Sequence, residues 1–384
     1  MNENNLNSEE KQDDSVFLGS SILDKIISSK EDQEKQEFNP SEVIAQLLKR
    51  LTSKEAEVIK RRFGLAGNKK ETLEVIGARY QVTRERIRQI ENLAIKKIKE
   101  GINFNTLIKP VEQVLTRIIN QYGGVMEEDF LLHQLFFVDN NQSDQKATLF
   151  ILSELLNLRF IKIVSSETYR KAWQTQVADL KFINASVQEL IKIIEATGNP
   201  LSLEKVYSLF QTTEYYKLYS SKLEEKVIES YLELSQVVAR NPFDEYGLKK
   251  WGSVLPRRMN DKIYLVLNKE NKPMHFVDIA GKITQVFKKK AYPPTVHNEL
   301  ILNKKYVLVG RGIYALSEWG YKRGVVADVL IDILKKRQLP MTKDELLRAV
   351  LDQRMVKRNT IYLALTNKKK FKKLADGKYT LVIE

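Results

Sequence analysis

The side chains best suited to a chemical task lie together in residues 82–91, which read Val-Thr-Arg-Glu-Arg-Ile-Arg-Gln-Ile-Glu. Arginine can contact both acceptor atoms on the edge of guanine, glutamate can accept a hydrogen bond from cytosine, and glutamine can pair with adenine. A run that collects these three residue types therefore suits the reading of base pairs in a major groove. The alternative interpretation is a solvated charged face on an ordinary surface helix, which composition alone slightly favours.

A helix that begins at Thr83 would place these side chains on one face. Thr83 is a preferred N-cap residue. Four apolar residues then recur at helical spacing, namely Ile87, Ile90, Ala94 and Ile98. The opposite face carries the polar residues Arg84, Glu85, Arg88, Gln89 and Asn92. Residues 72–80 predict a short helix that ends just before a tight turn. Two helices joined this closely, the second of them polar and basic, predict a helix-turn-helix.

Residues 51–55, 62–65, 71–77 and 82–91 resemble the fourth conserved region of bacterial sigma-70 family initiation factors. The resemblance covers about residues 40–99, and 83–91 are its most specific stretch. In that family the region binds the minus-35 promoter element and the flap of RNA polymerase. The resemblance therefore implies DNA contacts at the matching positions Lys54, Arg62, Thr72, Leu73, Arg84, Glu85, Arg88 and Gln89.

Length and composition limit the class of protein. A chain of 384 residues predicts two to four domains. The absence of cysteine excludes disulfides and thiolate metal sites, and the three histidines are too far apart for metal-ligand spacing. No apolar run approaches the ~20 residues of a membrane span, and the acidic N-terminus is unlike a signal peptide. We therefore expect a cytoplasmic, nucleoid-associated protein with no cofactor, metal, membrane contact or small-molecule substrate.

The net charge of +14 is unevenly distributed. Residues 39–109 carry a net +8, residues 258–320 a net +6 and residues 321–384 a net +9, whereas residues 1–38 carry −6 and residues 110–257 carry −3. Positive charge therefore gathers in the helix-turn-helix segment and in the last third of the chain, as expected if those parts face phosphates. Basic domains also occur for solubility alone.

The chain after residue 101 repeats an order of elements. Each of four segments predicts a helix, a short segment headed by Gly or Pro, a second helix, a third helix and two strands. The second-helix segments begin at Gly124, Pro200, Pro273 and Pro340. The closing strands are expected to carry Tyr169, Tyr246, Tyr314 and Tyr379, and tryptophans follow three of these tyrosines at Trp173, Trp251 and Trp319. A period near ~70 residues indicates repeated domains.

Three helices followed by a two-stranded hairpin describe a winged helix, and residues 310–312 and 376–377 predict the turns of the third and fourth wings. We predict a mainly α fold with small β-hairpins. A disordered acidic tail is expected over 1–39, with a short amphipathic pattern at 17–27. The expected domains are a helix-turn-helix over 40–101 and four tandem winged-helix units over 110–180, 183–256, 258–320 and 323–384.

The third unit resembles the HARE-HTH winged-helix family at residues 273–280, 294–300 and 310–316. That family links bacterial transcription proteins, including the delta subunit of RNA polymerase, with restriction enzymes and eukaryotic chromatin proteins. The third helices and wings of the last two units add candidate DNA contacts, namely His297, Asn298, Arg311, Arg358 and Lys378.

These patterns favour a DNA-binding transcription factor that recognises double-stranded promoter DNA resembling the minus-35 element and contacts the flap of core RNA polymerase. Only about 40 residues precede the helix-turn-helix, too few for the sigma domain that binds the polymerase clamp, so a complete sigma factor is not expected. The alternative is an interaction scaffold that docks on RNA polymerase without specific DNA reading, which the acidic-leaning segment 110–257 fits. An enzyme is disfavoured, because residues 224–226 offer only a Glu-x-Lys pattern on an amphipathic helix and no nucleophile-base pair appears.

Overall fold

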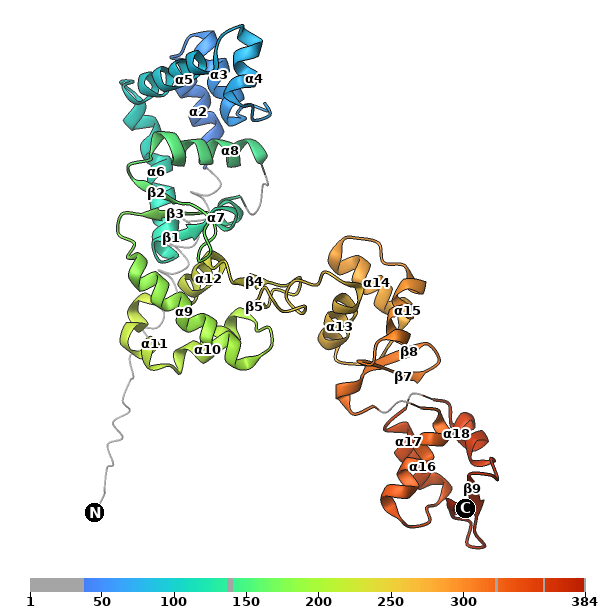
Figure 1. Cartoon of the computed structure of the whole chain (residues 1–384). Helices are drawn as coiled ribbons and strands as arrows, with labels where there is room; N and C mark the ends of the chain where they lie inside the picture. The colour runs from blue at the N-terminus through green and yellow to red at the C-terminus, as the bar shows by residue number, and fades with distance from the viewer. Residues whose placement is uncertain (1–37, 137–140, 322–323, 355, 383–384) are drawn as a thin grey trace, which may run out of the picture. The chain divides into compact units, whose positions relative to one another are not determined.

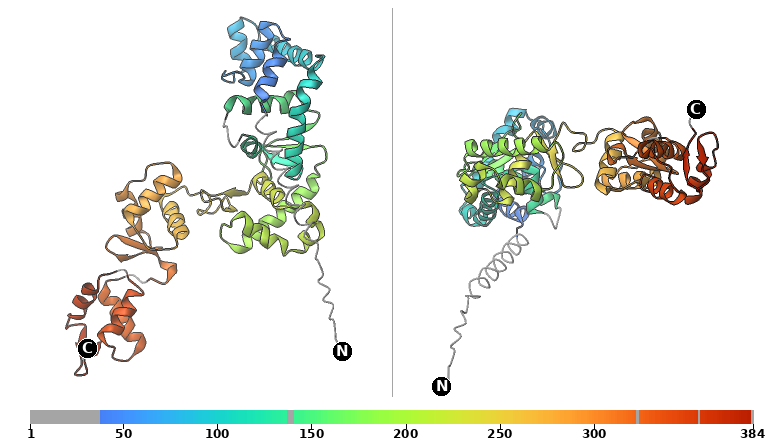
Figure 2. Two further views of the ribbon diagram at one scale, coloured as in Figure 1. Left: turned by 180° about the vertical axis from the view of Figure 1, so that it is seen from behind. Right: turned by 90° about the horizontal axis from the view of Figure 1, so that it is seen from below.

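The computed structural model describes residues 38–136, 141–321, 324–354 and 356–382 and is mainly helical, with small antiparallel sheets (Figures 1 and 2). Within these residues the chain forms two compact units. The first runs to Ile193 and resumes over Glu204–Val237, and the second comprises Ile194–Leu203 and the chain from Val238 onward. The predicted disordered tail, with its amphipathic pattern at 17–27, lies outside the described residues except at its last two positions.

The helix-turn-helix segment consists of α2 (Pro40–Leu48), α3 (Ser53–Phe63), α4 (Leu73–Tyr80) and α5 (Arg84–Lys99). Three of these helices begin at a threonine whose side chain accepts a hydrogen bond from a backbone N–H three residues later, at Thr52, Thr72 and Thr83. The buried residues of α5 are Ile87, Ile90, Ala94 and Ile98. The predicted cap and the predicted apolar stripe of this helix are both confirmed.

The turn between α4 and α5 brings two backbones into close contact. Gln81 adopts the left-handed conformation, with φ of 55°, and the Val82 N–H donates to the Gly77 carbonyl at 3.0 Å. A Cβ atom added at Gly77 would lie 2.7 Å from the carbonyl oxygen of Val82. Glycine at position 77 therefore permits the close crossing that sets the angle between the two helices.

Four segments with similar orders of helices and strands follow, which we label repeats 1 to 4; repeat 2 has an additional short helix. Repeat 1 (104–175) contains α6 (Phe104–Gln121), β1 (Val125–Glu127), α7 (Glu128–Leu135), α8 (Gln142–Phe150), the π-helical turn η1 (Ile151–Leu155), β2 (Phe160–Ile163) and β3 (Ala172–Thr175). Repeat 2 (180–248) contains α9 (Leu180–Thr197), α10 (Leu203–Gln211), α11 (Glu214–Tyr219), η2 (Ser220–Lys222), α12 (Glu225–Leu234), β4 (Val238–Arg240) and β5 (Tyr246–Leu248).

The last two repeats lie in the second unit. Repeat 3 (259–316) contains α13 (Met259–Glu270), β6 (Met274–His275), α14 (Phe276–Phe287), α15 (Pro293–Leu302), β7 (Tyr306–Gly310) and β8 (Ile313–Leu316), followed by η3 (Ser317–Trp319). Repeat 4 (326–381) contains α16 (Val326–Arg337), α17 (Lys343–Leu351), α18 (Arg358–Leu365), β9 (Phe371–Lys373) and β10 (Tyr379–Leu381).

The repeats share a sheet topology that the sequence pattern only partly predicts. The last strand of repeats 1 and 3 pairs on both sides, giving the orders β1-β3-β2 and β6-β8-β7. In repeats 2 and 4 the first strand is reduced to a single bridge, Leu201 with Tyr246 and Met341 with Tyr379. The segment headed by Gly or Pro thus supplies a short third strand. Gly312 and Gly377, with φ of 70° and 84°, form the predicted hairpin turns.

The prediction that Tyr169 lies in the closing strand of repeat 1 is wrong. Tyr169 lies before β3 and bridges to Ser235. The residue paired with the first strand is instead Trp173, which lies opposite Met126 as Tyr314 lies opposite Met274. The longer connection between β2 and β3 shifts the register, which residue spacing alone could not reveal.

One apolar cluster runs from the helix-turn-helix segment into repeat 1. The rings of Phe63 and Phe150 lie 4.6 Å apart, and the Ser41 N–H donates to Asp144 Oδ1 at 3.0 Å. The expected boundary between residues 101 and 110 stays a proposal, and the apolar core is continuous across it. The cluster includes Ile44, Leu47 and Ile59 from the helix-turn-helix segment and Leu115, Ile119 and Phe150 from repeat 1. A smaller cluster joins α3, α4 and α5 through Val58, Leu73, Ile76, Ile87 and Ile90.

Gly77→Ala should destabilise the helix-turn-helix by about 1–3 kcal/mol, because the new methyl group overlaps the Val82 carbonyl. The measurement is amide hydrogen exchange of α4 and α5 in the full chain, which reports the local opening free energy. Gly281→Ala is the matched control, since a Cβ atom there meets nothing within 4 Å. The control should leave the exchange of α4 and α5 unchanged, because Gly281 lies in α14 of repeat 3. Equal exchange rates in the two variants would contradict the proposed role of Gly77.

Candidate nucleic-acid interface

The polar face of α5 is open to solvent, as the sequence predicts. Arg84, Glu85, Arg88 and Gln89 are all exposed, because the buried stripe of the helix faces α3 and α4. The side chains of Arg84, Glu85 and Arg88 retain 69%, 57% and 54% of their accessible surface. This face therefore presents donors and acceptors of the kinds that read base edges.

Carboxylates hold two of these arginines. Arg88 donates through Nε and Nη2 to the two carboxylate oxygens of Glu85, at 2.9 and 2.7 Å. The hydrogen bond from Arg88 lowers the pKa of Glu85, so both groups are charged at neutral pH. Arg84 Nε lies 3.0 Å from Glu74 Oε1 on α4. The pairs restrain the arginines on the first turns of α5 while leaving them exposed.

The other predicted DNA-contact residues in this segment differ in how far their side chains are buried. Thr72 and Lys54 are exposed near the first turns of α4 and α3, and Lys54 Nζ lies 5.4 Å from the centre of the Tyr80 ring. Leu73 is only 7% exposed and belongs to the smaller apolar cluster. A DNA contact at Leu73 is therefore limited to its backbone.

Arg62 has a structural partner. Its Nε lies 3.5 Å from Glu91 Oε1 and thereby joins α3 to α5. Burial raises the pKa of Glu91, and the nearby Arg62 charge opposes that rise. The Glu91 side chain retains 12% of its accessible surface and Arg62 retains 31%. Arg62 Nη1 also donates to the Glu71 carbonyl at 3.5 Å, so the guanidinium lies between α5 and the loop before α4.

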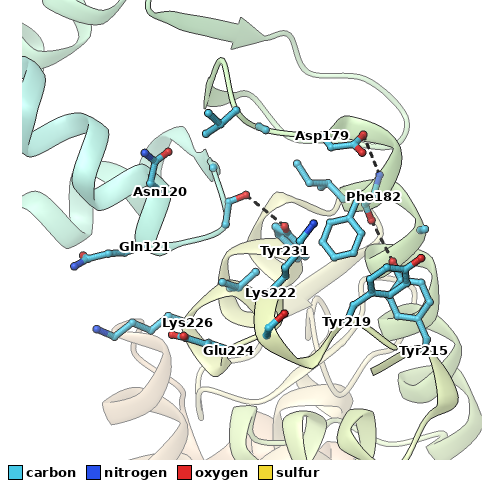
Figure 3. A pocket seen from close by; sticks show the side chains of 18 residues that line it. Asn120, Gln121, Asp179, Phe182, Tyr215, Tyr219, Lys222, Glu224, Lys226 and Tyr231 are labelled. Atoms are coloured by element: carbon cyan, nitrogen blue, oxygen red, sulfur yellow. Dashed lines mark hydrogen bonds between the residues drawn. The ribbon is translucent and has the colours of Figure 1, made fainter. Parts of the chain in front are cut away.

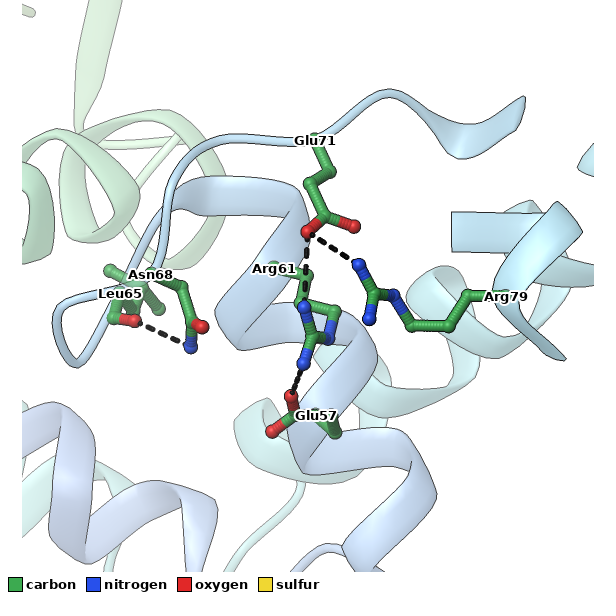
Figure 4. A network of polar contacts seen from close by, with 6 residues as sticks. All are labelled: Glu57, Arg61, Leu65, Asn68, Glu71 and Arg79. Atoms are coloured by element: carbon green, nitrogen blue, oxygen red, sulfur yellow. Dashed lines mark hydrogen bonds and ion pairs between the residues drawn. The ribbon is translucent and has the colours of Figure 1, made fainter. Parts of the chain in front are cut away.

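A second polar network, which the sequence did not indicate, fixes the loop between α3 and α4 (Figure 4). Arg61 lies between Glu57, at 2.6 Å, and Glu71, at 3.0 Å. Arg79 of α4 reaches the same Glu71 oxygen at 3.5 Å. The hydrogen bond that Arg61 donates to Glu71 raises the pKa of Arg61 further. Glu71 thus ties both helices of the pair to the loop that joins them.

The candidates of repeats 3 and 4 lie in the second unit. Asn298, Arg311 and Arg358 are exposed. The His297 ring stacks on Phe276 with 4.4 Å between ring centres, so it packs within repeat 3. Lys378 is half-buried, and its Nζ lies 3.7 Å from Asp376 Oδ2 in the hairpin turn. These residues therefore form a separate set from the α5 face, and His297 is the one least available to a ligand.

The helix-turn-helix also matches a known domain. Residues 47–100 match the family model described as Sigma-70, region 4. This segment is a sigma-70 region 4 domain. The RNA polymerase sigma factor SigA of Lactococcus lactis subsp. cremoris is 40% identical over 88 residues, which are 23% of this chain and 24% of that protein. The RNA polymerase sigma factor RpoD of Neisseria gonorrhoeae is 48% identical over 58 residues, 15% of this chain and 9% of that protein. The chain thus spans about a quarter or less of the length of these curated relatives.

Outside the region 4 domain, a pocket of about 870 Å³ lies between repeat 1 and helices of repeat 2 (Figure 3). Several of its polar groups have internal partners. The Tyr231 hydroxyl donates to the Gly123 carbonyl at 3.3 Å, and Asp179 Oδ1 accepts from the Phe182 N–H at 3.3 Å. Burial raises the pKa of Tyr215 and of Tyr231, so both phenols stay protonated. These contacts hold helices together and do not assemble a nucleophile with a base.

Among the described residues, no group of three or more His, Asp or Glu side chains is placed to hold a metal ion. No helix among those residues is both long and apolar enough to cross a membrane.

Arg62→Met should destabilise the region 4 domain at about pH 7 by about 1–3 kcal/mol, because the mostly buried Glu91 carboxyl loses the cation that offsets its burial. A carboxyl whose folded-state pKa is raised stabilises the fold in its protonated form, and that contribution is lost as the pH rises through the folded-state pKa. The variant should therefore recover stability relative to wild type as the pH falls toward about 4.

Hydrogen exchange of α3 and α5 against pH measures this effect. Glu91→Gln in the Arg62→Met background provides the control, since it removes the charge and should restore most of the stability near neutral pH. A stability loss that is the same at both pH values would assign Arg62 a packing role alone.

Proposed function

We propose that this protein is a DNA-binding transcription factor whose α5 helix reads promoter DNA resembling the minus-35 element. The observation that carries the proposal is the exposed face of α5, where Arg84, Glu85, Arg88 and Gln89 are presented by a region 4 domain. Lys54, Thr72 and the Leu73 backbone N–H are proposed to contact DNA phosphates beside α5. Contacts to phosphates fix the orientation of a protein on DNA, whereas contacts to bases carry sequence information.

We further propose that repeats 1 to 4 are winged-helix units, the third of the HARE-HTH type. The pairing of a short first strand with the last strand, repeated four times, supports this assignment. On this proposal the chain carries one sigma domain attached to a winged-helix array. Asn298, Arg311, Arg358 and Lys378 are proposed as phosphate or groove contacts of the last two units.

RNA polymerase is the proposed protein partner, because the relatives of the region 4 domain are named RNA polymerase sigma factors. The alternative function, a scaffold that docks on polymerase without specific DNA reading, is favoured by the acidic-leaning segment 110–257. The full chain is the form to test, because α8 of repeat 1 covers apolar surface of α2 and α3 that an isolated domain would expose.

Arg88→Ala should weaken binding to a minus-35-like site roughly ten- to hundredfold and relax its sequence specificity, because a bidentate base contact is lost. Glu85→Ala should do the same, since it removes an acceptor and frees Arg88 from its partner. The measurement is a set of equilibrium titrations with matched and mismatched duplexes.

The control is Lys96→Ala, which removes one exposed cation from the last turns of the same helix, away from the proposed base readers. It should change the affinity for both duplexes about equally. Unchanged discrimination in Arg88→Ala and Glu85→Ala would remove α5 from the role of reading helix.

The polymerase proposal is tested by retention of core RNA polymerase on the immobilised full chain. The Arg84→Ala/Arg88→Ala double variant should lose promoter DNA but keep the polymerase, because both arginines belong to the exposed α5 face that is proposed to read DNA. Retention of polymerase by a wild-type chain that shows no sequence preference for DNA would favour the scaffold. Failure to retain polymerase would restrict the protein to DNA binding.

A salt titration tests the last two repeats, which carry net charges of +6 and +9 over 258–320 and 321–384. Each neutralised phosphate adds about −0.9 to the slope of log affinity against log salt. The full chain should therefore show a steeper slope and a longer footprint than the 1–257 truncation. Their Lys-rich surfaces act as point charges, so the added binding should tolerate changes in sequence. Equal slopes and equal footprints would show that these repeats do not touch DNA.

A further inference from the structure

The helix that precedes the hairpin, which we call the third helix, differs in exposure among the four repeats; in repeat 2 it is α12, which follows the short additional helix α11. In α8 of repeat 1 only Gln142 is exposed, and in α12 of repeat 2 only Lys226 is exposed. In repeat 3, α15 exposes Thr295 and Asn298, and in repeat 4, α18 exposes Arg358 and Asn359. A helix that enters a major groove needs an exposed row of polar side chains. By this measure α8 and α12 lack the required surface, whereas α15 and α18 have it.

The region 4 domain covers α8. Phe150 of α8 packs against Phe63 of α3, and Ala147 and Phe150 are each 1% exposed. Polar contacts follow the apolar ones. Asp144 Oδ1 accepts from the Ser41 N–H at 3.0 Å, and Lys146 Nζ donates to the Asn68 carbonyl at 3.4 Å. The one lysine of α8 is therefore directed to the loop of the region 4 domain.

Repeat 1 covers α12 in turn. The Ser230 hydroxyl donates to the Val125 carbonyl of β1, and the Tyr231 hydroxyl donates to the Gly123 carbonyl. Arg170, which precedes β3, lies 3.0 Å from Glu233 of α12. A Cβ atom at Gly123 would lie 2.7 Å from Val227 Cγ1, so a glycine permits this close approach. The turn before β1 therefore packs closely against α12.

We propose that repeats 1 and 2 do not read nucleic acid, and that their third helices are docking surfaces for a neighbouring part of the same chain. The partner of α8 is the region 4 domain, and the partner of α12 is the β1 edge of repeat 1. The inference rests on the proposed winged-helix assignment. Its consequence is that the first unit meets DNA through the region 4 domain, while further nucleic-acid contacts belong to repeats 3 and 4.

The distribution of charge supports this division. Residues 110–257 carry a net −3, and α12 itself includes Glu225, Glu229 and Glu233. An acidic surface repels phosphates and would weaken DNA binding. Residues 258–384 combine +6 and +9 over their two segments, for a net +15. The sign of the charge therefore changes between the repeats with covered third helices and those with open ones.

Lysine-acetylation footprinting of the full wild-type chain, with and without a promoter duplex, tests the proposal without altering the fold. Lys146 of α8 and Lys226 of α12 should react at the same rate in both states. Lys357 and Lys368, which flank α18, should react more slowly when DNA is bound. Protection of Lys146 or Lys226 by DNA would overturn the proposal.

Salt titrations of two charge-reversal variants provide a second test of the proposal. Lys226→Glu should leave the slope of log affinity against log salt unchanged, and Arg358→Glu should reduce its magnitude by about 0.9 or more. A reduction of that size in Lys226→Glu would also overturn the inference. An unchanged slope in Arg358→Glu would instead contradict the proposed DNA contacts of repeat 4. Absence of DNA binding by the wild-type chain would contradict the proposed function itself.

Discussion

The packing of α8 against α2 and α3 is the contact on which the first unit depends. The four helices of the region 4 domain bury only a small cluster among themselves around Ile76 and Ile87. Their larger apolar surface, which includes Ile44, Leu47 and Phe63, is buried by repeat 1. Because apolar surface removed from water is the main source of folding free energy, the stability and orientation of α5 depend on the contact with repeat 1.

Polar contacts in this domain perform two different tasks according to their burial. The Arg62–Glu91 pair and the Glu71 network lie at helix junctions, where removal of one partner strands a charge away from water. The Arg88–Glu85 and Arg84–Glu74 pairs lie in solvent, where an ion pair contributes little to stability. The exposed pairs can therefore exchange their partners for base edges or phosphates, whereas the buried ones fix the helices that carry them.

The sequence was most informative where a local rule applies. A threonine cap followed by isoleucines at helical spacing predicted α5, and the polar residues left on its other face predicted the exposed site. The pattern was least informative where partners come from distant segments. Ala147 and Phe150 of α8 are buried against the region 4 domain, and no pattern in the sequence indicated that α3 covers them. Tyr169 matched the spacing of the other tyrosines, although strand pairing selects Trp173, because register depends on the loop and not on the count of residues. The sequence around Glu71 indicated only a charged loop, and its contacts with Arg61 and Arg79 could not be predicted from it.

Lysines flank the exposed third helices of repeats 3 and 4, and this feature is visible in the sequence alone. The open helix α15 holds no Lys or Arg between Pro293 and Leu302, but lysines flank it at 288–290 and at 304–305. Lysine runs likewise follow α18 at 368–370. Cations that flank a helix suit phosphates on either side of a groove, whereas base reading requires side chains on the helix itself. Among the described helices only α5 combines exposed Arg, Glu and Gln on one face, which is why the proposed sequence recognition falls to that helix. The lysine-flanked helices suit contacts with phosphates, which every duplex offers.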